Sequence, residues 1–460
     1  MCESSRNGTE ACSCPHCPPR KRVSSRSRRS VPMSAPSCAA ESITAGSIEY
    51  SPLHIRPCAS YNVTMAIFLL ENTIKKYHWG DPDLIPEFLG FPNPEREPYA
   101  ELWLGDHPLA TSVTIGPGGE RVGLDELIAR DPVSALGPDA RTGYRLPFLF
   151  KLLALGRPLS IQVHPSRLKA SRGFEREERS VLPLDATERN YVDMNHKPEF
   201  LVALDCFEGM CGFRPIDEIV DNIKMLAGER WRRYAGRLAG DPGKMELAVL
   251  FYNFIAPDAA TKATVLAGTR TRIDRILARA APDSAIARTF AWIPRLMDEF
   301  PGDMGAMAPI LLNTFDMKPG QGLFVAPGQP HAYLRGSALE IMGNSDNKVR
   351  AGLTHKRVDL AEFISVLDFD IGPLSFIEPA GGLEAIRAGR TDSAIGGFIP
   401  YPVESDEFSL AMARLEGRIE AAARPRIPEI LLCMDGNAHI EGSDGCALPL
   451  SRGSSVFIEA

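Results

Sequence analysis

The hydrophobic pattern of this 460-residue chain changes its period twice, and that change limits the possible folds more than any other feature. Short apolar segments bounded by Gly, Pro and Asn fill the first part of the sequence, for example at 102–104 and 148–155. Between residues 214 and 303 the apolar residues recur with a helical period instead, and short segments then return. Many short strands predict a sandwich or barrel, whereas the longer period predicts helices. We therefore predict a mainly β fold with an α-helical insertion.

The insertion, residues 214–303, is predicted to contain amphipathic helices. Their apolar stripes lie at Ile216–Leu226, Leu247–Phe254, Ile273–Leu277 and Phe290–Phe300. Pro294 is expected to kink or delay the last of them. These stripes are most simply packing faces, and none of them identifies a ligand. Outside the insertion, helices are expected only at 124–128 and 358–366.

Two side chains with donor atoms lie close together on a predicted strand. Gln162 and His164 follow an apolar strand, 146–155, and a turn at Gly156. Side chains two residues apart on a strand share a face, so these two lie side by side. A polar sheet face with one ordinary histidine is the simplest interpretation, and half of a metal site is the alternative.

Two later segments favour the metal site. Glu199 stands at the start of a strongly apolar strand, where a charged side chain needs a specific partner. His331 follows another strand and a Pro-Gly turn. With Gln162 and His164 they form a mixed nitrogen and oxygen set, suitable for zinc, manganese or ferrous iron.

Basic residues follow the last of these histidines. Arg350 and Lys356 are candidates for binding a phosphate, because a guanidinium can pair with two phosphate oxygens and an ammonium adds a point charge. A solvated loop is the alternative for two basic residues of this kind.

Four dispersed motifs carry a family resemblance. The segment 322–331 resembles the second motif of the cupin barrels. In their order, LSIQVHP (159–165), NHKPE (195–199), APGQPHAY (326–333) and SDNKVRAGLTHK (345–356) resemble the type I mannose-6-phosphate isomerases. YHWG at 77–80 and YAELWLGDHP at 99–108 support the resemblance, which extends from about residue 65 to the end of the chain.

The resemblance implies a reaction and a metal. These enzymes interconvert mannose 6-phosphate and fructose 6-phosphate, so a small-molecule sugar phosphate is the expected partner. One zinc ion per chain is expected on the family's four ligands, which match Gln162, His164, Glu199 and His331. Arg350 matches an arginine usually assigned to the active site, where it either holds the phosphate or neutralises the enediolate. The pathway implied is supply of mannose for GDP-mannose and glycan synthesis, or its entry into glycolysis.

The group that moves the proton is left open between three side chains. Lys197 lies two residues before a ligand, where a divalent cation would favour its neutral amine, which can accept a proton. Glu340 and Asp346 are rival bases, and the sequence does not rank them.

Three further residues are substrate-binding candidates, as is Lys356. Ser160 faces the same way as Gln162, and the resemblance suggests contact with the phosphate, although a hydroxyl that supports the metal ligands would look the same. Trp103 is expected near the mouth of the pocket in this family, with core packing as its alternative. His196 is a candidate for assisting ring opening.

The resemblance also predicts the domain organisation. A metal-binding cupin barrel (jelly roll) is expected from residues 65–213 and 304–367, with the helical insertion, 214–303, beside the pocket. Residues 368–460 are expected to form a second cupin-type unit, since their end resembles 317–326. This unit is predicted to be incomplete, which would leave an open sheet edge.

The first 64 residues differ in composition from the rest. They hold six of the ten cysteines and are rich in Ser, Pro and Arg, so a disordered extension is predicted. Cys12, Cys14 and Cys17 could bind a metal, and the segment 20–29 could be a targeting signal. The interpretation we favour is that translation starts at Met65.

Composition excludes several classes of function. With 44% hydrophobic and 24% charged residues, and no apolar run near the ~20 residues that cross a bilayer, a membrane protein is not expected. The net charge of -7 argues against a nucleic-acid partner. We expect a cytoplasmic protein, because few cysteines remain after the extension. A monomer is also expected.

Two other functions fit the same ligands. Two histidines and a carboxylate also describe the ferrous site of a metal-dependent cupin oxygenase. A non-catalytic sugar-binding cupin is the other rival. The glutamine ligand and the basic pair favour the isomerase over both.

Overall fold

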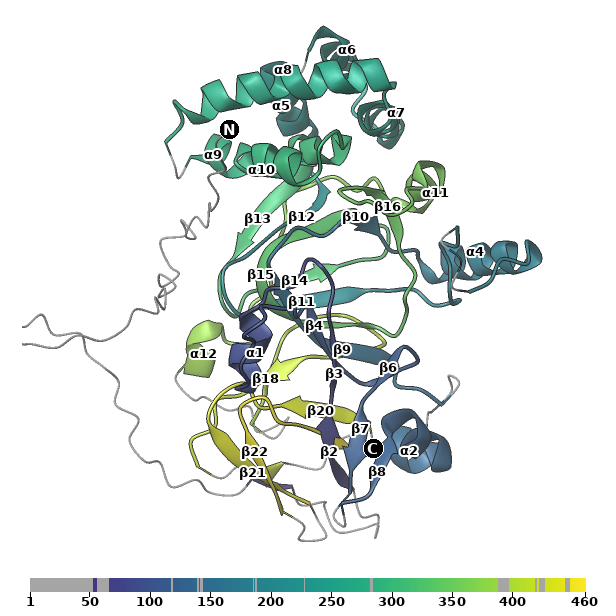
Figure 1. The fold of residues 1–460 in the computed structure, drawn as a ribbon, viewed down its shortest axis with the longest axis vertical. Coiled ribbons are helices and arrows are strands. Elements are labelled where there is room, and N and C mark those ends of the chain that lie inside the picture. Colours follow the sequence, from purple (N-terminus) through teal and green to yellow (C-terminus); the bar gives the residue numbers. More distant parts are fainter. Residues whose placement is uncertain are drawn as a thin grey trace, which may run out of the picture.

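The computed structural model describes residues 53–55 and 66–460, apart from 117–118, 139, 141–143, 185, 187, 227, 282–283, 388–396, 418–419, 422–426 and 443–446. Of the extension predicted for residues 1–64, only β1 (Leu53–Ile55) is among them. Within the described ranges, each helix is too short or too polar to cross a bilayer. The fold is mainly β, with helices concentrated at one end (Figure 1).

The longest strand, β15 (His331–Gly343), organises the largest sheet system. Its first residues pair with β10 and β12, and its later residues pair with β9 and β11. All but one of its 13 residues are buried, because neighbouring layers cover both of its faces. The other strands of this system are β3 (Thr73–Lys75), β4 (Glu101–Leu104), β9 (Phe148–Leu155), β10 (Ile161–Val163), β11 (Glu199–Ala203), β12 (Phe207–Phe213), β13 (Leu312–Met317), β14 (Gly322–Val325) and β16 (Val349–Gly352).

The predicted insertion is helical, and it packs against one end of this sheet system (Figure 1). Its first helix begins at Ile216, where the predicted apolar stripe also begins, but the insertion contains more helices than the sequence indicated. Pro294 lies in the first turn of its last helix, where no backbone N–H is needed. Its helices are α5 (Ile216–Leu226), α6 (Glu229–Gly240), α7 (Lys244–Ile255), α8 (Ala259–Leu277), α9 (Ala285–Phe290) and α10 (Trp292–Glu299). The 3₁₀ helix η1 (Met304–Ile310) directly follows the insertion.

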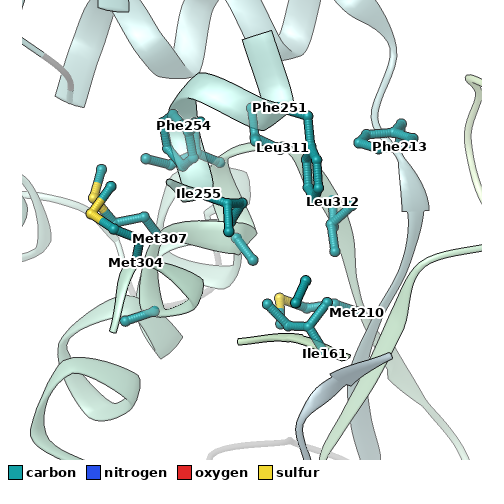
Figure 2. Packing of buried hydrophobic residues seen from close by; sticks show 14 of the residues in the cluster. Ile161, Met210, Phe213, Phe251, Phe254, Ile255, Met304, Met307, Leu311 and Leu312 are labelled. Carbon is teal, nitrogen blue, oxygen red and sulfur yellow. The ribbon is translucent and has the colours of Figure 1, made fainter. Parts of the chain in front are cut away.

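These helices share one hydrophobic core with the strands that carry the site. Phe251 and Phe254 of α7 pack in the same cluster as Met304 of η1, Ile161 of β10 and Met210 of β12 (Figure 2). Ile161 precedes one of the predicted metal ligands. The end of the helical region is therefore in direct contact with the strands that position the site.

A second sheet joins the two ends of the chain. Its order is β20-β23-β2-β7-β8, so β2 (Ile67–Glu71) lies between β23 (Ser455–Ile458) and β7 (Val113–Ile115). Strands from both predicted barrel units therefore share one sheet. The remaining strands are β5 (Asp106–His107), β6 (Ala110–Thr111), β8 (Arg121–Gly123), β17 (Ile399–Pro400), β18 (Ala411–Met412), β19 (Glu420–Ala421), β20 (Glu429–Leu432), β21 (Asn437–Glu441) and β22 (Ala447–Ser451).

Six α-helices lie outside the insertion in the part of the chain that the structure describes. Two were predicted, and the one near residue 360 begins after Asp359, whose side chain accepts a hydrogen bond from the N–H of Glu362. They are α1 (Leu84–Leu89), α2 (Leu124–Arg130), α3 (Pro132–Leu136), α4 (Arg167–Arg179), α11 (Leu360–Val366) and α12 (Leu383–Arg387).

Cys206 is disulfide-bonded, although few disulfides were expected, whereas Cys211 and Cys433 are free.

Candidate active site

Three of the predicted metal ligands converge at the ends of three strands. His164 follows β10, Glu199 begins β11 and His331 begins β15. Each offers a ligand atom, and these atoms all lie within 4.8 Å of one another. The fourth, Gln162, is paired with His331 in the β10–β15 register and lines the adjoining cleft. The strand ends therefore bring together two imidazoles and a carboxylate beside an amide.

The hydrogen bonds of the two histidines suit a metal. Nδ1 of His164 lies 2.7 Å from the carbonyl oxygen of Asn347, and Nδ1 of His331 lies 3.0 Å from that of Gln329. A carbonyl accepts, so Nδ1 carries the proton and Nε2 keeps its lone pair. Nε2 of His331 is buried with no hydrogen-bond partner, as expected of an atom that binds a metal.

The charges of the cluster also fit a divalent cation. Burial, reinforced by Lys197, lowers the pKa of His164 to about 3, and burial lowers the pKa of His331 as well. Burial alone would raise the pKa of Glu199, but Lys197 and the imidazoles hold it well below its usual range. Neutral imidazoles and an ionised carboxylate are the forms that bind metals.

A tyrosine supports the carboxylate from behind. The hydroxyl of Tyr333 donates to Oε2 of Glu199 over 2.6 Å, and both side chains are buried. Groups that orient a ligand in this way typically raise metal affinity.

Tyr333→Phe should therefore weaken divalent-metal affinity by about 10- to 100-fold, because Glu199 loses the donor that orients it. Competition with a chromogenic chelator measures this affinity. Tyr401→Phe is the matched control, since this buried tyrosine donates to the carbonyl of Gly320 instead. Equal affinities of the two variants would show that Tyr333 does not position the ligand.

Among the basic side chains that line the same cleft are Lys151, Lys197, Lys348, Arg350 and Lys356. Burial lowers the pKa of Lys348 to about 8, and the neighbouring cations Lys197, Arg350 and Lys151 act in the same direction. Burial and Arg350 lower the pKa of Lys356. Lys151, Lys197 and Lys348 pair with carboxylates, whereas Arg350 and Lys356 have no ion-pair partner among the described residues and favour an anionic ligand.

Arg350 is the strongest candidate for binding an anionic ligand. It lies on β16, directly across from Gln162 of β10. Burial lowers the pKa of its guanidinium, and the described residues supply no acidic partner within ion-pair distance. Arg350 is half-buried, and an unpaired charge that is partly removed from water is costly, so a bound anion would stabilise it.

A lysine that the sequence interpretation missed forms a buried network with two candidates. Nζ of Lys151 lies 3.1 Å from Glu340, its direct neighbour in the β9–β15 register, and 3.8 Å from Glu101. It also lies 4.9 Å from the ring centre of Trp103, whose indole N–H donates to Glu101. The signal was a single charge in an otherwise apolar eight-residue strand.

The two carboxylate candidates differ in charge. Burial raises the pKa of Glu340 to about 6 in spite of Lys151. Burial would also raise the pKa of Asp346, but a hydrogen bond from His107 and the charge of Lys348 hold it well below its usual range. Nε2 of His107 lies 3.2 Å from Asp346, and its Nδ1 accepts the N–H of Leu109. Asp346 is therefore a fixed anion near neutral pH, whereas Glu340 titrates.

The remaining candidates lie around the cleft. Ser160, Trp103 and Lys356 line it. His196 does not line the cleft, and its Nε2 bonds to Glu407, which does line it and also pairs with Arg167 over 2.7 Å. Nine of the twelve candidate residues therefore line this cleft, and His164 and His331 join Glu199 in the ligand cluster beside it.

Comparisons with known proteins identify the family. The model of the catalytic domain of type I phosphomannose isomerase matches residues 67–216. Mannose-6-phosphate isomerase of Escherichia coli is 34% identical over 85% of this chain and 94% of its own length. The corresponding human protein is 32% identical over 66% of this chain and 73% of its own length. The chain belongs to the type I phosphomannose isomerase family.

Solved structures of this family agree with the fold. A crystal structure of zinc-bound mannose 6-phosphate isomerase matches 86% of this chain and 94% of its own, with a TM-score of 0.73 and 32% identity. A single-site variant of phosphomannose isomerase from Salmonella typhimurium gives the same TM-score at 31% identity. The family resemblance seen in the motifs is confirmed.

Proposed function

We propose that this chain is a zinc-dependent isomerase that interconverts D-mannose 6-phosphate and D-fructose 6-phosphate. The observation that carries the proposal is the position of Arg350, a half-buried cation without an acidic partner among the described residues, directly across from Gln162 in the cleft of the metal ligands. An anion site beside a Lewis-acid site suits a phosphorylated sugar. The family of the relatives supports the same substrate.

One zinc ion per chain would be held by the four ligands at the strand ends: Gln162, His164, Glu199 and His331. When bound, zinc supplies Lewis-acid stabilisation of the negative oxygens that develop on the sugar. Two imidazole nitrogens and two oxygens are a donor set that zinc accepts. Nε2 of His331 is buried with no hydrogen-bond partner, so its lone pair is available to such an ion.

The chain's own residues bind the substrate and move the proton. Lys356 and Ser160 hold the phosphate, and Arg350 either shares it or neutralises the enediolate. Isomerisation takes a proton from carbon 2 and delivers one to carbon 1. The candidates for this transfer remain Lys197, Glu340 and Asp346, while Trp103 closes the wall beside them.

Each candidate base has its own partner. Nζ of Lys197 lies 2.7 Å from Oε1 of Glu199. Glu340 pairs with Lys151 and Asp346 with His107. His196, held by Glu407, remains our candidate for assisting ring opening at the edge of the cleft.

The pH dependence of kcat/KM should report the protonation of Glu340. With a pKa of about 6, this carboxyl is protonated below that pH and no longer neutralises Lys151. The phosphate of the substrate also takes up a proton at about pH 6. We expect kcat/KM to fall below pH 6 by more than about tenfold per pH unit in the unmodified protein, since two protons are involved.

Glu340→Gln should reduce that dependence to the single proton of the phosphate. The measurement is kcat/KM against pH for both proteins. An unchanged slope in the variant would show that Glu340 does not control the acid limb. Glu97→Gln, an exposed substitution, is the control for general effects.

Activity itself tests the proposal against its two rivals. Conversion of mannose 6-phosphate should be followed with a coupled assay, beside oxygen uptake in the presence of ferrous iron. Isomerisation without oxygen uptake supports the proposal. Oxygen uptake would support the cupin oxygenase, and sugar-phosphate binding without turnover would support the non-catalytic cupin.

We also propose the finer organisation and setting of the protein. Residues 65–213 and 304–367 would form the metal-binding cupin barrel, 214–303 a helical domain and 368–460 a second cupin-type unit. A cytoplasmic monomer that supplies mannose for GDP-mannose synthesis, with no nucleic-acid or membrane partner, is the setting expected for this reaction. The Escherichia coli relative is named a mannose-6-phosphate isomerase, which supports the reaction on which this setting rests.

A further inference from the structure

The segment that leaves the helical region touches the substrate side of the cleft at three points. Glu299, at the end of α10, lies 3.1 Å from the guanidinium of Arg157, which precedes Ser160. The ring of Phe300 lines the cleft and lies 6.1 Å from that of His355. Asp303 then reaches the loop that follows β16.

Asp303 holds that loop through its carboxylate. Its Oδ2 accepts hydrogen bonds from the backbone N–H groups of Leu353 (2.8 Å) and Thr354 (3.4 Å). Its Oδ1 accepts from the N–H of Gly305 over 2.7 Å, so one side chain both starts η1 and fixes the loop. Thr354 in turn accepts the N–H of Lys356 over 3.0 Å, which sets the turn that carries this lysine.

The backbone of the loop is in a conformation that needs such a support. Leu353 has a φ of +54°, which leucine rarely adopts, and it is buried. Strained residues of this kind persist when their surroundings fix them. Here the two N–H groups that follow β16 are fixed by Asp303.

The two segments also approach too closely for any side chain between them. A Cβ at Gly352 would lie 2.9 Å from Oδ1 of Asp303 and 3.2 Å from Cα of Gly305. A Cβ at Gly305 would lie 3.0 Å from the nitrogen of Leu353 and 3.1 Å from Ile161. Both glycines are therefore required by this contact.

We infer that Asp303 is a positioning residue that holds the loop of residues 353–356 against the cleft, so that Lys356 meets the substrate phosphate beside Arg350. The inference rests on the proposed function for the identity of the ligand. It gives the exit of the helical region a role in binding the sugar phosphate. Asp303 touches neither the metal ligands nor the proton-transfer candidates, so its effect should fall on binding rather than on chemistry.

Asp303→Asn is the test. The amide NH₂ of asparagine would face at least one of the backbone N–H groups that now donate to the carboxylate, so that hydrogen bond would be lost. We expect KM for mannose 6-phosphate to rise by about tenfold while kcat changes by less than about threefold, as for loss of one supported contact. The affinity for sorbitol 6-phosphate, which has no carbonyl to react, should fall by the same factor in calorimetry. Zinc content should be unchanged.

Two further variants make the result specific. Gly352→Ala should have the same effect on KM, since its Cβ pushes the loop from Asp303 without removing the carboxylate. Asp258→Asn is the matched control, because this aspartate caps α8 through the N–H of Thr261 but lies away from the cleft. It should leave both KM and the affinity for sorbitol 6-phosphate unchanged.

The outcomes separate the inference from the proposed function. Unchanged affinity for sorbitol 6-phosphate in both Asp303→Asn and Gly352→Ala, or a loss confined to kcat, overturns the positioning role. If the unmodified chain binds sorbitol 6-phosphate but does not isomerise, the proposed function fails, and the calorimetric comparison still decides the role of Asp303. No binding by the unmodified chain overturns both.

Discussion

Glu199→Gln should lower turnover of mannose 6-phosphate by about 10³-fold or more, because a Lewis acid contributes several kcal/mol and each ~1.4 kcal/mol is a factor of ten. Glu199 lies 3.0 Å from Nε2 of His164 and 3.5 Å from Nε2 of His331, so it is central to the ligand cluster. A neutral amide would bind zinc weakly and would also leave Lys197 without its carboxylate. Zinc content and kcat are the two measurements.

Glu177→Gln is the matched control for this variant. Glu177 is also a buried carboxylate, but it accepts the backbone N–H groups of Asn190 and Tyr191 and does not line the cleft. Its substitution should leave zinc content and kcat close to those of the unmodified chain. A zinc-loaded Glu199→Gln protein with kcat within tenfold of normal would refute the assignment of Glu199 as a ligand.

Arg350→Ala should lower kcat/KM by about 10²- to 10³-fold, the usual cost of removing one charged group that stabilises a reacting anion. The division of the loss between KM and kcat decides between its two possible roles. A rise in KM indicates that the guanidinium holds the phosphate, whereas a fall in kcat indicates that it neutralises the enediolate. Arg350→Lys should recover little, because an ammonium cannot pair with two oxygens in the same plane.

Arg335→Ala is the control for removal of an arginine. Its guanidinium lies 2.6 Å from Glu208, and neither residue lines the cleft. We expect kcat/KM of this variant to stay near normal. A similar small effect for Arg350→Ala would show that the cleft does not use Arg350 for its anion.

The cluster of candidate metal ligands could be predicted because local sequence places its members. Gln162 lies on the short strand β10 and His164 directly follows it, Glu199 begins a strand of buried residues, and His331 begins another. Each is a polar residue at the boundary of an apolar strand, where a structural role alone is hard to explain. The structure brings His164, Glu199 and His331 together as those positions predicted.

Other parts of the site depend on contacts that local sequence does not show. Lys151 was read as part of an apolar strand, because only pairing with β15 reveals Glu340 opposite it. Asp303 bonds to residues 50 and 51 positions further along the chain, which no periodicity records. The helix α4 was missed because its sequence is polar on nearly every side, so its apolar stripe is short.

The domain boundaries show the same limit. The helical stripe near Ile216 and the return of short strands near Leu312 were visible as changes of period. The pairing of β2 with β23 was not, because strands from opposite ends of a chain carry no signal of their partnership.

The most direct test of the account is the zinc dependence of isomerisation. The chain should be purified, stripped with a chelator, and assayed for conversion of mannose 6-phosphate to fructose 6-phosphate before and after zinc is added. We predict that activity is lost on stripping and restored by zinc at about one ion per chain. A folded, zinc-loaded chain that does not interconvert the two sugar phosphates would contradict the proposed function.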